Sequence, residues 1–178
     1  MATANNKSVF VVYGRNKHVM REMFAFLKML SLSPIPWEEA VLSTSRSASY
    51  IGETLYGLLQ QAQAVVVLLT GDDEAQLRSE FFINGDSVND RALFPQPRPN
   101  VLFETGMAFS HSWLAPRTIL VEAGKVRICH ALEGRHRIKL SNKFEDRWAL
   151  IRSLEAAGCA VEIPSYELLR EVGDFNFE

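Results

Sequence analysis

The chain has few cysteines, no excess of either charge and no long apolar run. Its two cysteines, Cys129 and Cys159, cannot form a metal site alone. Nineteen basic residues stand against twenty-one acidic ones, which leaves no electrostatic footprint for nucleic acid or an anionic membrane. The longest apolar run, 62–70, is far shorter than a membrane span, and the N-terminus lacks a secretory apolar segment. These absences predict a cytoplasmic protein with reduced thiols.

What the chain does have is enough apolar residues for one substantial core. Hydrophobic residues make up 47% of its 178 residues, which is sufficient without disulfides or a structural metal. We expect a flexible N-terminus over residues 1–7 and one domain over 8–160. Residues 161–178 are expected to form a C-terminal extension that carries a short helix over 166–172.

Short β-branched runs alternate with amphipathic stretches along the chain. The strands are expected at 8–13, 32–37, 64–70, 117–122 and 137–140, and the helices at 17–31, 51–62, 100–113 and 144–157. This alternation predicts an α/β domain: one five-stranded parallel sheet of order 2-1-3-4-5 with helices on both faces. Pro34 and Pro36 remove two hydrogen-bond donors from the second strand, which is therefore expected at the sheet edge.

A charged stretch over residues 71–98 has no usable period. It contains Asn84-Gly85-Asp86 and two prolines, and a third proline, Pro99, follows it directly; these residues break up any long element. We expect a functional or mobile loop here.

In such sheets, ligands bind beyond the carboxyl ends of the strands, where the strand order reverses. The residues that follow the first three strands are Tyr13, Gly14, Arg15 and Asn16; Trp37, Glu38 and Glu39; and Gly71, Asp72 and Asp73. Gly14 and Gly71 permit tight turns in which backbone amides could face an anion. Equally, Arg15 could be a solvated turn residue, Trp37 a rim aromatic and Asp72 a turn former. No dinucleotide-binding or Walker glycine motif follows the first strand.

Glu104 is the one charged residue in the helical stretch NVLFETGMAFSHSW, residues 100–113. Its neighbours at three and four residues' spacing are uncharged, so it has no salt bridge within the helix. The carboxylate must therefore face solvent, accept hydrogen bonds from elsewhere, or lie in a cleft with an altered pKa.

Six blocks of sequence carry a family resemblance: VFVVYGRN, PIPWEEA, SYIGETL, QAQAVVVLLTGDDEA, RPNVLFETGMA and LEGRHRIKL. In order and spacing they resemble bacterial TIR-like predicted nucleotide-binding domains, over about residues 8–160. Such domains are effector parts of cyclic-nucleotide-activated anti-phage defence proteins. The resemblance implies a flavodoxin-like TIR fold and an NAD+ glycohydrolase that releases nicotinamide and ADP-ribose or a cyclic variant. It also implies that Glu104 is the catalytic carboxylate.

The resemblance extends to ligands and partners. NAD+ is then the substrate, with no metal and no separate cofactor. The expected substrate-binding residues are Tyr13, Gly14, Arg15, Asn16, Trp37, Ser49, Tyr50, Asp72 and Asn100. Related sequences often carry histidine where Tyr13 stands, so the contacts there are expected to differ. Self-association into a homo-oligomer or filament and a cyclic-nucleotide sensor domain in the full-length protein are also implied.

Two alternatives remain open. A non-catalytic TIR interaction module would use the surface loop over 43–50 and would tolerate changes at Glu104. A nucleoside or nucleotide N-glycoside transferase would resemble deoxyribosyltransferases, which carry a glutamate followed by glycine in a similar α/β fold. Glu104 favours the enzymes over the module but does not distinguish NAD+ from other N-glycosides.

Overall fold

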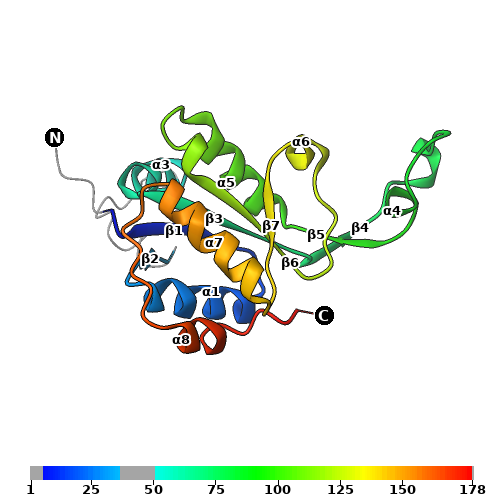
Figure 1. Cartoon of the computed structure of the whole chain (residues 1–178). Coiled ribbons are helices and arrows are strands. Elements are labelled where there is room, and N and C mark those ends of the chain that lie inside the picture. The colour runs from blue at the N-terminus through cyan, green and yellow to red at the C-terminus, as the bar shows by residue number, and fades with distance from the viewer. Residues whose placement is uncertain (1–5, 37–50, 178) are drawn as a thin grey trace.

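The computed structural model describes residues 6–36 and 51–177, and its body is a five-stranded parallel sheet between two helical layers (Figure 1). The strand order is β2-β1-β3-β6-β7, and every neighbouring pair is parallel. These strands are β1 Ser8–Val12, β2 Ser33–Ile35, β3 Ala64–Thr70, β6 Thr118–Ala123 and β7 Arg137–Lys139. The expected order 2-1-3-4-5 is confirmed, because the two additional strands, β4 (Asp73–Ala75) and β5 (Phe94–Gln96), form a separate sheet.

The two central strands are buried along their whole length. Every residue of β1 and β3 is buried, which is why their sequences are continuous apolar runs and not alternating ones. The strand that contains Pro34 lies at the end of the sheet and pairs only with β1, Pro34 opposite Val9. The edge position predicted from the prolines is confirmed, since an edge strand needs fewer ladder donors.

Helices cover both faces of the sheet. Helices α1 (Lys17–Met29), α7 (Phe144–Ala156) and α8 (Tyr166–Glu171) share one apolar cluster with the sheet, whereas α3 (Ile51–Gln61) and α5 (Pro99–Ser110) share the other. In α1 the buried side chains recur at helical spacing: Val19, Met23, Phe26 and Leu27. Figure 1 shows α3 and α5 on the opposite side of the sheet from α1 and α8. The predicted long helices are therefore present, with ends that differ by up to three residues.

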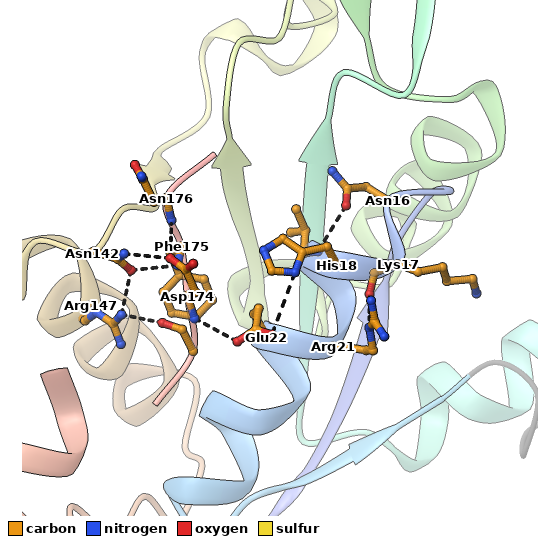
Figure 2. A network of polar contacts seen from close by, with 12 residues as sticks. Asn16, Lys17, His18, Arg21, Glu22, Asn142, Arg147, Asp174, Phe175 and Asn176 are labelled. Atoms are coloured by element: carbon orange, nitrogen blue, oxygen red, sulfur yellow. Dashed lines mark hydrogen bonds and ion pairs between the residues drawn. The ribbon is translucent and has the colours of Figure 1, made fainter. Parts of the chain in front are cut away.

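The C-terminal residues are part of the hydrophobic core. Leu169 and Phe175 are almost completely buried, 0% and 1% exposed, against the cluster that α1 and α7 share. The buried guanidinium of Arg147 donates hydrogen bonds to the carbonyls of Leu169 (3.1 Å), Val172 (2.6 Å) and Gly173. Figure 2 shows Arg147 and Asn142 converging on this segment. The segment after residue 160 therefore packs against α1 and α7.

Residues 73–96 form an arm that projects from the body (Figure 1). Its base is the antiparallel pair of β4 (Asp73–Ala75) and β5 (Phe94–Gln96), and its outer part contains η1 (Ser79–Phe81) and α4 (Val88–Arg91). The irregular loop expected over 71–98 is thus partly wrong, because tertiary contacts order the hairpin. Arg127 donates to the Gln96 side chain (2.9 Å) and to the Ala75 carbonyl (3.4 Å).

Two short elements complete the body, and neither was predicted. They are η2 (Ala115–Arg117), which leads into β6, and α6 (His130–Glu133), which precedes β7. Among the described residues, no helix is both long enough and apolar enough to span a membrane.

Candidate functional site

A cavity of about 410 Å³ opens at the carboxyl end of β1, between the beginnings of α1 and α5. In the order of strands, β1 lies where the chain turns from one side of the sheet to the other, which is where ligands bind in such folds. Its polar lining consists of Tyr13, Arg15, Lys17, Arg98, Asn100 and Glu104, and the rest is Phe10, Val11, Gly14 and Val101.

Helix α5 fixes Glu104 in this cavity. The helix begins at Pro99, whose missing amide costs nothing at a first helical position. Its buried residues, Val101, Thr105 and Ala108, hold one face against the sheet. Asn100 and Glu104 lie one helical turn apart, beside this buried face, and both line the cavity.

The Glu104 carboxylate is half-buried and has no hydrogen-bond or ion-pair partner among the residues that the structure describes. Burial disfavours the charged form and raises its pKa from 4.5 to about 7. A carboxyl group of this kind is close to half ionised at neutral pH. It can therefore respond strongly to a positive charge that a ligand brings beside it.

Three basic side chains line the same cavity. Arg15 and Lys17 come from the β1–α1 turn and the first residue of α1, and Arg98 immediately precedes α5. Lys17 Nζ lies 4.9 Å from the centroid of the Tyr13 ring, and Arg98 Nε lies 3.5 Å from Asp73 Oδ1. The cavity thus combines several cations with one uncompensated carboxyl group. Such a lining suits a ligand with both anionic and cationic parts.

Two of the predicted site residues are engaged with the backbone. Asp72 Oδ2 accepts hydrogen bonds from the amides of Arg15 and Asn16, the latter at 3.3 Å. Asn16 Oδ1 accepts from the Val19 amide at 3.2 Å and so caps α1. Neither Asp72 nor Asn16 lines the cavity. The amides expected to face an anion do so, but the anion is the protein's own carboxylate.

The structure brings five of the predicted site residues together around the cavity: Tyr13, Gly14, Arg15, Asn100 and Glu104. Trp37, Ser49 and Tyr50 lie outside the described residues. Lys17 and Arg98 were missed. Their positions gave a signal, since Lys17 follows the strand-one rim directly and Arg98 precedes the Pro99 that begins the helix of Glu104.

In the described part of the chain, no three His, Cys, Asp or Glu side chains are placed to hold a metal ion.

Comparison with known families identifies the chain. No curated protein matches it. The family model described as "CAP12/Pycsar effector protein, TIR domain" matches residues 8–142, well over half of the chain. This region contains all five strands of the parallel sheet and every residue that lines the cavity. The chain therefore belongs to the TIR domains of CAP12/Pycsar effector proteins, a family of anti-phage defence effectors.

Proposed function

We propose that this TIR domain is an NAD+ glycohydrolase in which Glu104 is the catalytic carboxylate. The observation that carries the proposal is the position of Glu104: half-buried and unpartnered, in a cavity at the carboxyl end of the sheet. Membership of a TIR effector family supports it, because the resemblance to TIR-like effector domains implies NAD+ glycohydrolase activity. The reaction would take place in the cytoplasm, on the cell's own NAD+.

The chemistry needs one carboxylate and one water molecule. The bond between the anomeric carbon of the ribose and the nicotinamide nitrogen breaks, and its electron pair leaves with neutral nicotinamide. Water then adds to the anomeric carbon and releases a proton, which gives ADP-ribose; attack by a group of the substrate itself would give a cyclic product. An ionised Glu104 would stabilise the positive charge that develops on the ribose.

The charges of NAD+ suit those of the cavity. Its diphosphate is anionic and its nicotinamide ring is cationic, whereas the cavity offers Arg15, Lys17 and Arg98 together with Glu104. A cationic ring next to Glu104 would offset the desolvation that disfavours the ionised carboxylate in the free protein. Binding of this substrate would therefore help to ionise the group that the reaction requires.

The decisive experiment measures nicotinamide release from NAD+ by wild type and by Glu104→Gln. We expect the variant to lose at least about 1000-fold in rate, because its amide cannot stabilise the developing charge as an anion does. Glu155→Gln, which alters an exposed glutamate of α7, is the matched control and should retain activity. Undiminished release by Glu104→Gln would refute the proposal. A nucleoside and a free base added together would reveal base exchange, the transferase alternative.

We also propose that activity depends on self-association into a homo-oligomer or filament, driven in the full-length protein by a cyclic-nucleotide sensor domain. The support is membership of the effector family. The same release assay, repeated over a range of protein concentrations, tests this dependence. Specific activity should rise with concentration; a constant value would mean that each copy acts alone.

A further inference from the structure

The β1–α1 turn differs from a phosphate-binding turn in what occupies its amides. At this position in parallel α/β folds, the amides at the beginning of the helix commonly point at a ligand phosphate. Here the amides of Arg15 and Asn16 both donate to Oδ2 of Asp72, which comes from the end of β3. A phosphate cannot reach them unless the Asp72 carboxylate leaves.

The fit between Asp72 and the turn is close. A Cβ atom added at Gly14 would overlap Asp72 Oδ2 and lie 3.0 Å from Asp72 Cγ. The next atom it would meet, Arg98 Cγ, is 3.6 Å away, an ordinary contact distance. The backbone at Gly14 has no positive φ, so the constraint against a side chain there comes from Asp72. Asp72 therefore holds the turn that places Tyr13 and Arg15 on the cavity.

The cationic groups that line this cavity are side chains. Arg15 and Lys17 lie at the turn and at the first residue of α1, and Arg98 lies across the cavity at the beginning of α5. Arg98 shares its charge with Asp73 in a partly exposed ion pair, and such pairs are weak enough to rearrange around a ligand. Arginine in particular matches the two-oxygen edge of a phosphate.

We propose that the diphosphate of the substrate is bound by the side chains of Arg15, Lys17 and Arg98, while Asp72 occupies the backbone amides and positions the turn. The inference rests on the proposed function for the identity of the substrate. Asp72 is then a positioning residue, since it acts through the turn and does not touch the ligand.

The first test uses ADP, which carries a diphosphate but no nicotinamide, in a calorimetric binding experiment with the whole chain. Arg15→Gln, Lys17→Gln and Arg98→Gln should each weaken ADP binding about 10-fold, the effect of one charge-assisted hydrogen bond. The control is Arg152→Gln, an exposed arginine of α7. Equal affinity in all five proteins would overturn the proposal.

The second test is a double-mutant cycle between Gly14 and Asp72. Gly14→Ala alone should lower both the Tm and the affinity for ADP, because its methyl group displaces the Asp72 carboxylate. In an Asp72→Ala background the same change should have little effect, since the atoms it would overlap are gone. Additive losses would overturn the assignment of Asp72 as the group that holds the turn.

The positioning role also makes a kinetic prediction within the same test. Asp72→Ala should raise KM for NAD+ more than it lowers kcat, and Asp72→Asn, which keeps an acceptor oxygen, should recover part of the loss. A fall in kcat alone would contradict the role. ADP binding does not depend on turnover, so the two proposals can fail separately. If ADP binding depends on the three cations but no nicotinamide is released, only the proposed function is wrong. If nicotinamide is released but ADP binding does not depend on the cations, only this inference is wrong.

Discussion

At the scale of the residue, Glu104 and Asp72 show what the sequence can reveal about an acidic side chain. Glu104 was identifiable because its helix offers it no charged neighbour, and the structure places it in a cavity. Asp72 lies at the same rim, yet its carboxylate turns to the amides of Arg15 and Asn16. Which rim carboxylate faces the cavity depends on the path of a turn that follows another strand, and local sequence does not encode that path.

The raised pKa of Glu104 predicts how the reaction depends on pH. On the proposed function the catalytic form of Glu104 is ionised, so kcat/KM for NAD+ should rise with pH and level off above the pKa of the free protein, about 7. Arg15, Lys17 and Arg98 line the same cavity as Glu104. Initial rates at low NAD+ between about pH 5 and pH 9 give the profile. A midpoint near 4.5, the ordinary value, would mean that burial does not govern this carboxyl group.

At the scale of the element, short segments were the hardest to predict, although the three-residue strands β2 and β7 were found. The strands of the main sheet and the long helices carry apolar runs or helical periods, and these were found within a few residues. Strands β4 and β5 and helices α4 and α6 have three or four residues each, too few to show a period. The arm is set by contacts that its own sequence does not contain, such as those from Arg127 to Gln96 and Ala75.

The link between α7 and the C-terminal segment rests on Arg147. Its guanidinium donates to three main-chain carbonyls and to Asn142 Oδ1 (2.8 Å), and lies against the rings of Phe26 and Phe175. Asn142 Oδ1 also accepts from the Phe175 amide, and Glu22 of α1 accepts from the Asp174 amide, both links visible in Figure 2. One buried cation thus joins α7 to a segment that also contacts α1.

We therefore expect Arg147→Ala to lower the free energy of unfolding by about 3 kcal/mol or more, because several buried carbonyls lose their donors. Arg147→Lys keeps a positive charge but lacks the planar set of donors of arginine, so its free energy of unfolding should lie between those of Arg147→Ala and wild type. Chemical denaturation measures the difference. Arg152→Ala, on the exposed face of the same helix, should change it by less than about 0.5 kcal/mol. Equal effects of the two alanine variants would mean that Arg147 does not hold the C-terminal segment in place.

At the scale of the whole molecule, a tightly packed body contrasts with an arm whose outer part has little burial. Exposed apolar side chains gather along the arm at Leu77, Phe81, Ile83, Val88 and Leu93, with exposed fractions from 38% to 81%. None of the residues from 76 to 93 whose burial is described is buried. The arm therefore adds little apolar burial to the stability of the body.

Replacement of residues 76–93 by Asn-Gly, a dipeptide that favours a tight hairpin turn, should leave the Tm within a few degrees of wild type. The Asn-Gly turn would connect Ala75 to Phe94, and these two residues already face each other across the hairpin. Thermal unfolding measures the outcome, with Phe175→Ala as a variant that should unfold at a much lower temperature because it empties a core position. A large drop in the shortened chain would place the arm within the cooperative unit.

The burial of the C-terminal segment affects where the smallest independently folding piece can end. The family match stops at residue 142, but α7 follows it and contributes Leu150, Ile151 and Leu154 to the core, and Phe175 lies further on. A fragment trimmed to the matched region would lose these core residues and would expose the apolar surface of α1 and the sheet that they cover. The boundary for expression or for grafting this effector onto another sensor should therefore follow Phe175.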